Sequence, residues 1–232
     1  MKNGKGYYKS YNENGRLVLE YEILNGEPTG KVRKYYDNNI LRFEGEYINN
    51  SANGKCKRYY ESGKLEFEGE YFFGKPTGKG IFYQENGKIS REGEFLNGKM
   101  NGMIKLYDDE GNLKFEGEFL RNIKNGKGKE YYKNELICEG EYFNNERWIG
   151  KGKEYNKKDL LTYEGEYLNG VRWIGKGYDY DDNDSLLFKV KYLNGKKIVE
   201  EVFDWDLKVY FKIYYIGNLS IIYYLIIFIS FY

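Results

Sequence analysis

Paired glutamates are the residues of this 232-residue chain whose types and spacing first suggest chemistry. In the stretch FEGEYFFGKPTGKG, residues 67–80, Glu68 and Glu70 flank a glycine. Two carboxylates at positions i and i+2 of a strand share one face and lie about 6.6 Å apart. That separation on its own suits the acid and base of an inverting glycosidase. The GKG at residues 78–80 suggests in turn a loop that holds a phosphate.

The paired glutamates recur along the chain, which changes their interpretation. The leading glutamate of each copy stands at steps of 23 to 25 residues, at Glu20, Glu44, Glu68, Glu92, Glu116, Glu139 and Glu164. A feature present in every repeat is first of all structural. Lysines precede the pairs at Lys55, Lys57, Lys79, Lys127, Lys129, Lys151 and Lys153. We therefore expect a solvated ladder of cross-strand ion pairs and no catalytic residues.

The glycine–lysine runs do not fit a nucleotide site. GKG recurs at 78–80, 126–128, 150–152 and 175–177, without the GK[ST] ending of a phosphate-binding loop and without a helix predicted to follow. We expect no cofactor at these runs.

The rest of the composition argues against catalysis and metal binding. Histidine is absent, which removes the commonest general base and the commonest metal ligand. The two cysteines, Cys56 and Cys138, lie three repeats apart, or roughly 29 Å at two strands a repeat, which is too far for a disulfide. We expect two buried free thiols, a state compatible with the cytoplasm. The sequence predicts that the protein is not an enzyme.

Charge and the ends of the chain set limits on partners. Lys and Arg number 37 and Asp and Glu 36, so we expect no general attraction to nucleic acid. The first residues, MKNGKGYYKSY, contain no apolar run typical of a signal peptide, and we expect a cytoplasmic protein. An array that begins this early without a polar end repeat is typical of a piece of a longer one.

The elements that position the glutamates are predicted from one repeat, residues 54–77. Leu65, Phe67, Gly69 and Tyr71 alternate with glutamates, the period of a strand with one buried face. The turn ESGK precedes it, and a second strand at about 55–60 precedes the turn. Each repeat is thus a two-stranded hairpin, with a bulge expected between Cys56 and Tyr59 because their parity differs. The glycine between the glutamates is expected to make room for an aromatic ring of the facing strand.

The repeat, written YYxxGxLxFEGEYxNGKxxGKG, resembles the MORN repeat, and more closely its bacterial variant form, over roughly residues 5–198. The resemblance implies an all-β, elongated, solenoid-like array of about eight two-stranded hairpins. It also implies a scaffold or binding module, and some bacterial relatives are known as antitoxins. Choline-binding repeats are similar in plan, but they need about two tryptophans a repeat, whereas this chain has three in total.

Two loops depart from the repeat and are the candidate partner-binding site, with Trp148 and Trp173 at the position that holds Pro28, Ala52, Pro76, Met100 and Lys124 in other repeats. Both have the sequence RWIGKG, with Arg147 and Trp148 in one and Arg172 and Trp173 in the other. Tryptophan and arginine are enriched at the centres of protein interfaces. The alternative is that both indoles cover one edge of the core.

The repeat ends near Lys197. Residues 1–198 form the predicted array, 199–212 a degraded repeat or a cap, and 213–232 an uncharged apolar tail. As a helix, the tail would span about 30 Å, the thickness of the bilayer's hydrocarbon core. It is a membrane anchor, a cap on the last hairpin, or sequence foreign to the array.

The sequence therefore predicts a non-enzymatic scaffold or protein-interaction module with an unknown protein partner. A membrane-attached adaptor, held through residues 213–232, and the antitoxin of a toxin–antitoxin pair are the alternatives.

Overall fold

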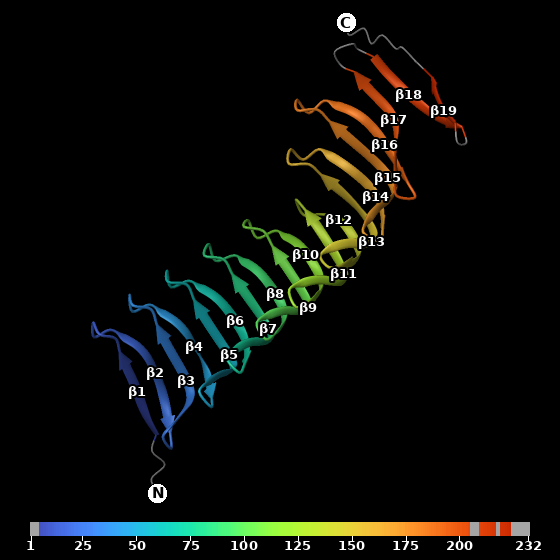
Figure 1. The fold of residues 1–232 in the computed structure, drawn as a ribbon. Coiled ribbons are helices and arrows are strands. Elements are labelled where there is room, and N and C mark those ends of the chain that lie inside the picture. The colour runs from blue at the N-terminus through green and yellow to red at the C-terminus, as the bar shows by residue number, and fades with distance from the viewer. Residues whose placement is uncertain (1–4, 205–208, 217–218, 224–232) are drawn as a thin grey trace. The chain divides into compact units, whose positions relative to one another are not determined.

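The structure is a computed structural model that describes residues 5–204, 209–216 and 219–223. The chain folds into β-strands over these residues. Within these residues there are 19 strands and no helix. The chain divides into two compact units, Met1–Glu135 and Leu136–Tyr232. Inside each unit, strands that follow one another in sequence pair antiparallel, so each unit is an open meander of hairpins (Figure 1). The predicted all-β hairpin array is confirmed.

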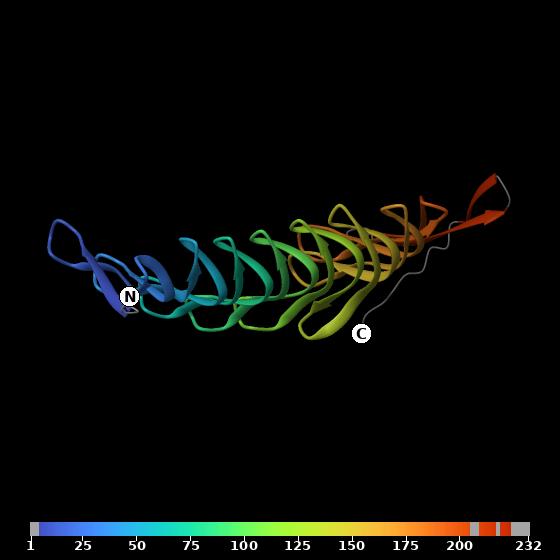
Figure 2. The same cartoon turned by 90° about the horizontal axis from the view of Figure 1, so that it is seen from below.

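The first unit contains eleven of the described strands. They are β1 (Lys5–Tyr11), β2 (Leu17–Leu24), β3 (Glu27–Tyr35), β4 (Leu41–Ile48), β5 (Ser51–Tyr59), β6 (Leu65–Phe72), β7 (Lys75–Tyr83), β8 (Ile89–Leu96), β9 (Lys99–Tyr107), β10 (Leu113–Leu120) and β11 (Ile123–Tyr132). The strands of these hairpins are curved, as the view in Figure 2 makes plain.

The second unit contains the remaining described strands. They are β12 (Glu135–Phe143), β13 (Glu146–Tyr155), β14 (Leu161–Leu168), β15 (Val171–Tyr180), β16 (Leu186–Leu193), β17 (Lys196–Asp204), β18 (Val209–Ile216) and β19 (Leu219–Tyr223). Strand β12 begins one residue before the boundary between the two units.

Two kinds of turn alternate along the meander. The turn between β5 and β6 is closed by Tyr60 N, which donates to Lys64 O at 2.8 Å, and Gly63 there has the predicted positive φ, 83°. The turn between β6 and β7 has two residues, Phe73 and Gly74, with φ of 46° and 78°. Positive φ at both positions matches the right-handed twist of a hairpin. Gly74 N also donates to Ala52 O at 2.9 Å, which ties this turn to the preceding hairpin.

Strand β5 begins four residues earlier than predicted, at Ser51. The reason is that Ala52 pairs with Tyr47 of β4 directly after a two-residue turn. The register does shift between Arg58 and Tyr59, but the unpaired residue is Glu66 of β6. Strand β5 keeps its alternation, so Cys56 and Tyr59 lie on opposite faces and the expected bulge within β5 is wrong.

Aromatic residues form the core on one face of each unit. Phe67 and Tyr163 are fully buried, and the predicted Tyr71 column is buried as well. The rings of Phe67 and Tyr71 are 5.5 Å apart although the residues are four positions apart on β6, so both lean over Gly69. The buried side chains are those of Val32, Ala52, Cys56, Phe67, Tyr71, Phe82, Phe95, Ile104, Phe115 and Phe119 in the first unit, and Cys138, Tyr142, Tyr163, Tyr167, Val190 and Tyr192 in the second.

The central glycine makes room for a neighbour other than the one expected. A Cβ at Gly69 would lie 2.8 Å from Phe67 Cζ, a ring of the same strand, and 2.6 Å from Gly80 Cα. The expectation of a ring from the facing strand is thus wrong here, because the facing main chain itself comes close. The ring that covers Gly69 also covers Gly80, where a Cβ would lie 2.7 Å from Phe67 Cε2.

The described part of the apolar tail consists of strands. Strand β18 pairs with β17 and β19 with β18, with Ile213 opposite Ile222. The helix considered for the tail is therefore wrong for residues 213–216 and 219–223, while 217–218 and 224–232 lie outside the described residues. The described parts of the chain include no helix of the length and apolarity that a membrane span requires.

The central glycine allows a direct test of the two faces. Gly93→Leu should lower the free energy of unfolding by roughly 1–3 kcal/mol through overpacking. Its φ is 140°, and a Cβ there would overlap the carbonyl oxygen of Met103 and lie 2.9 Å from Ile104 Cα. Glu94→Gln on the exposed face should change the free energy of unfolding by less than about 0.5 kcal/mol. Urea denaturation of both variants measures this, and equal losses would mean that the faces are assigned wrongly.

Candidate functional site

The glutamate pairs lie on the exposed face, opposite lysines. In the β5–β6 pair, Lys57 is opposite Glu68 and Lys55 opposite Glu70, and Lys57 Nζ lies 3.6 Å from Glu68 Oε2. The second unit repeats the arrangement, with Lys153 Nζ 3.5 Å from Glu164 Oε1 and Lys151 Nζ 3.1 Å from Glu166 Oε1. The ladder expected from the sequence is present in both units. Exposed pairs of this kind contribute little stability each, about 0–1 kcal/mol.

A tyrosine hydroxyl adds a stronger contact to the leading glutamate of five pairs in the first unit. Tyr59 OH donates to Glu44 Oε1 at 2.8 Å, because Tyr59 lies two residues after Lys57 on β5 and shares its face. The same bond, 2.6 to 2.8 Å long, joins five pairs in the first unit: Tyr35 to Glu20, Tyr59 to Glu44, Tyr83 to Glu68, Tyr107 to Glu92 and Tyr131 to Glu116. This residue pair was not singled out in the sequence, although a tyrosine 15 positions after each of these five glutamates was a visible signal.

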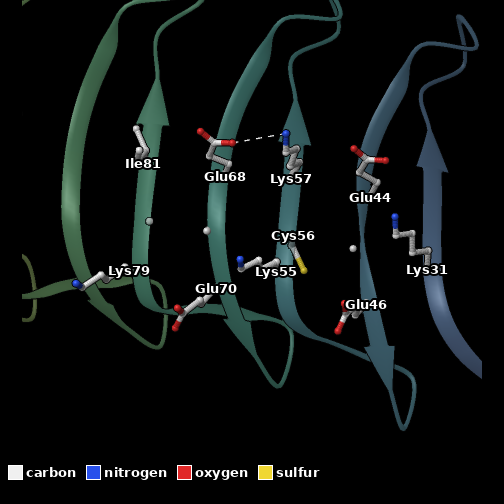
Figure 3. Close-up of a pocket in the computed structure, with 13 residues that line it drawn as sticks. Lys31, Glu44, Glu46, Lys55, Cys56, Lys57, Glu68, Glu70, Lys79 and Ile81 are labelled. Carbon is white, nitrogen blue, oxygen red and sulfur yellow. Dashed lines mark ion pairs between the residues drawn. The ribbon is translucent and has the colours of Figure 1, made fainter.

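A groove runs between two rows of charged side chains in the first unit (Figure 3). Its volume is about 560 Å³, and Cys56 lies between the rows together with glycine main chain. One row contains Glu44, Lys57 and Glu68, and the other contains Glu46, Lys55 and Glu70. A second hollow of about 400 Å³ extends from Lys79 to Glu116 and adds the apolar side chains of Ile81 and Met103.

The second unit has an equivalent hollow of about 510 Å³. It is lined by Cys138, by Glu139, Glu164 and Glu166, and by Lys151 and Lys153. Carboxylates and ammonium groups alternate in both units, so the groove can form ion pairs with a ligand segment that carries both signs of charge.

The groove offers no activated nucleophile at Cys56. Burial raises the pKa of the Cys56 thiol to about 11, so the thiol is protonated at neutral pH. Both cysteines are buried and free, as predicted. Among the described residues, no group of three or more His, Cys, Asp or Glu side chains is arranged to hold a metal ion.

The two arginine–tryptophan loops differ from the other loops by their strand register. Arg147 is opposite Tyr142, and Arg172 is opposite Tyr167. In β7, the residue opposite the equivalent Tyr71 is Pro76. The arginine therefore takes the place of the proline, and Trp148 is an extra residue where the register shifts. The spacing from the GKG glycines had predicted that the tryptophans, and not the arginines, stand at the position of the proline.

The arginines of these loops contact the buried tyrosines of the second unit. Arg172 Nη1 donates to Tyr192 OH at 2.8 Å, and Arg172 Nε donates to Glu154 Oε1 at 3.2 Å. Arg147 Nη1 donates to Tyr167 OH at 3.0 Å. Burial acts to raise the pKa of Glu154, but hydrogen bonds from Arg172 and Tyr167 outweigh it and the pKa is lowered. Both guanidinium groups thus have acceptors within the protein.

The tryptophans lie apart from the tyrosines that the arginines contact. Trp148 packs on the exposed Phe143, with ring centroids 5.2 Å apart, and its carbonyl accepts from Gly170 N in the next turn at 3.2 Å. The carbonyl of Trp173 likewise accepts from Gly195 N, at 3.1 Å. Each indole is partly buried against the turn of the hairpin that follows. A binding role for the four predicted residues stays a prediction.

The fold and these surfaces define a class of protein, the repeat proteins built from stacked antiparallel β-hairpins. The particular family follows from comparison. The MORN repeat variant matches residues 28–49 and 52–72, and the MORN repeat matches residues 67–89, 92–103, 115–136 and 163–173. The chain contains MORN repeats, as its sequence suggested.

Other comparisons add little. No curated protein matches the chain. Among solved structures, one chain of "Crystal Structure of TcdB2-TccC3-TEV" is 13% identical, with a TM-score of 0.24. The match covers 85% of this chain and 11% of that one, so this chain spans only a small part of it. A likeness at this level supports no argument about fold or function.

The tyrosine–glutamate bonds predict a loss of stability at high pH. Burial, and then the hydrogen bond to glutamate, raise the pKa of Tyr35, Tyr59, Tyr83 and Tyr107 to about 12, against about 10 for an unfolded tyrosine. Because the folded pKa is raised, the stabilisation is complete below pH 10 and is lost as pH rises through 12. Urea denaturation, with tyrosinate absorbance as a second signal, should follow this window.

A single variant isolates one of these bonds. Tyr83→Phe should lower the free energy of unfolding at neutral pH by about 0.5–1.5 kcal/mol, and the decline above pH 10 should become shallower. A decline of unchanged slope would show that Tyr83 does not contribute to it.

Proposed function

We propose that the chain is a non-enzymatic scaffold that binds a protein partner through a row of exposed apolar side chains beside the charged groove. In the first unit, one such side chain stands at the end of each second strand, between 37% and 58% exposed: Leu24, Ile48, Phe72, Leu96 and Leu120. Phe72 is two residues after Glu70 on β6, so both share a face. This apolar row is the observation that supports the proposal.

The row is more than a set of isolated exposed residues. Single apolar side chains are common on protein surfaces and need no explanation. Here the same position is apolar in consecutive hairpins, and stacked hairpins space it at about 9.6 Å, two strands of about 4.8 Å. A partner that presents apolar side chains at matching intervals contacts several hairpins at once.

The second unit has exposed apolar side chains of its own at the same position. Phe143 and Leu193 are 47% and 43% exposed there, and Trp148 packs on Phe143. Arg147 and Arg172 contribute by positioning the strand that carries each indole. In the second unit, the proposed partner-binding residues are therefore Trp148 and Trp173, with the arginines as supports.

The double variant Trp148→Ala/Trp173→Ala tests this proposal. It should keep the far-UV spectrum and the melting temperature of the parent, and it should lose proteins that the parent captures in affinity purification followed by mass spectrometry. Lys157→Gln, at an exposed turn position, is the matched control and should capture the same proteins. A large fall in melting temperature for the double variant would assign the indoles to the core and contradict the proposal.

Membrane attachment through residues 213–232 is a second candidate, supported by the absence of charge in those 20 residues. Full-length protein should then sediment with membranes and resist carbonate extraction, while a chain that ends at Lys212, and so lacks half of β18 and all of β19, should be soluble and keep the strands before β18 folded. Full-length protein that stays in solution would contradict the anchor. Unfolding of β16 and β17 on truncation would instead show that the strands after them act as a cap. The cytoplasmic location and the antitoxin role stay predictions.

A further inference from the structure

A row of two arginines and two phenylalanines crosses four strands on the aromatic face of the first unit. Arg58 of β5 is opposite Phe67 of β6, Phe67 is opposite Phe82 of β7, and Phe82 is opposite Arg91 of β8. The two rings are 4.5 Å apart. Both guanidinium groups approach the ring of Phe82, with Arg91 Cζ 4.1 Å and Arg58 Cζ 5.8 Å from its centroid.

The charge of Arg58 is matched by a carboxylate. Arg58 Nε donates to Glu66 Oε2 at 2.6 Å, and Arg58 Nη2 donates to Glu66 Oε1 at 2.8 Å. Two parallel bonds of this kind are the preferred geometry of an arginine–carboxylate pair. Both oxygens of Glu66 are therefore engaged by Arg58.

Arg91 has no such partner. Within the described residues its guanidinium contacts the Phe82 ring but has neither a hydrogen-bond acceptor nor a carboxylate within ion-pair distance. Its side chain is partly buried. Burial first, and the like charge of Arg58 second, lower the pKa of Arg91. A charge in such surroundings is unfavourable unless a counter-charge is present.

The arginines of the second unit show what is missing at Arg91. Arg147 donates to the hydroxyl of Tyr167, and Arg172 donates to that of Tyr192 as well as to Glu154. The buried residue that follows Arg91 on β8 is Phe95, whose ring lies 5.1 Å from that of Phe82 and carries no hydroxyl. The aromatic surroundings of Arg91 thus exclude the internal acceptors that the other arginines use.

We infer that Arg91, backed by the Phe82 ring, binds a single carboxylate group of a partner, an acidic side chain or a chain terminus. The planar guanidinium fork matches two carboxylate oxygens, and the phenylalanine ring accommodates the apolar part next to them. Two guanidinium groups and Glu66 leave one positive charge in the cluster, which one carboxylate neutralises. A phosphate dianion exceeds that charge and is repelled by Glu66.

The carboxylate site rests on the proposed scaffold function in one respect only, namely that the bound carboxylate belongs to a protein partner. It lies on the aromatic face, whereas the apolar row lies on the exposed face with the glutamates. Failure of one is therefore separable from failure of the other, because Trp148→Ala/Trp173→Ala should leave carboxylate binding at Arg91 unchanged.

The test is a titration of the full-length protein with sodium acetate, followed by NMR of the arginine Nε–H resonances. The Arg91 resonance should shift and saturate, while sodium chloride at equal ionic strength should give no saturable shift. Arg91→Gln should weaken acetate binding at least about tenfold, whereas Arg42→Gln should change it by less than about twofold. Arg42 is a suitable control because it also lies over a ring, that of Tyr36 at 5.5 Å, but is exposed.

Other outcomes decide against the site or against its ligand class. An equal response to chloride, or unchanged acetate binding in Arg91→Gln, would overturn the site. Tighter binding of inorganic phosphate than of acetate would overturn the carboxylate assignment. Should the glutamine variant fail to fold, Arg91→Lys retains the charge without the planar fork and should still weaken acetate binding. Acetate should raise the melting temperature of the parent and not that of Arg91→Gln or Arg91→Lys.

Discussion

The close approach of two main chains at the central glycines is the constraint on which the rest of the repeat depends. Gly69 and Gly80 face each other across β6 and β7, and the ring of Phe67 occupies the space where both would carry a Cβ. A sheet of a single layer has no second layer to cover its apolar face. Here the rings lie flat over glycine and against one another, so Phe67 is fully buried without one. Removal of either glycine would displace the ring that forms the core.

Other features of the repeat follow from that arrangement. With the rings gathered on one face, alternation sends both glutamates to the other, where the lysines of the preceding strand meet them. Alternation along β5 also places Tyr59 on the charged face, and its hydroxyl donates to the leading glutamate of the neighbouring strand, Glu44. The exposed face is thus linked across hairpins by a neutral donor and a charged acceptor, a contact that salt screens less than an ion pair.

The sequence was sufficient for the period, the hairpins and the outward glutamates, because each of these depends on local alternation and turn chemistry. It was not sufficient to predict which side chain fills the space over Gly69, since that depends on how closely the two main chains approach each other. It also misplaced the tryptophans by one position. Spacing from a glycine cannot distinguish an extra residue in a bulge from a substitution, and only the pairing of Arg147 with Tyr142 shows it.

One of the positions that vary between repeats is on the buried face, paired with the ring column. In successive hairpins this position holds Lys34, Arg58, Phe82, Leu106, Glu130, Glu154 and Asp179. The glycines and the outward glutamates change little, because the frame fails without them, whereas this position borders both the ring and solvent. Cations occupy it early in the chain and anions late, so the aromatic face of each unit has its own charge pattern on an otherwise constant frame. Arg172 pairs with the carboxylate of Glu154 in the second unit, whereas Arg91 in the first has no carboxylate partner among the described residues.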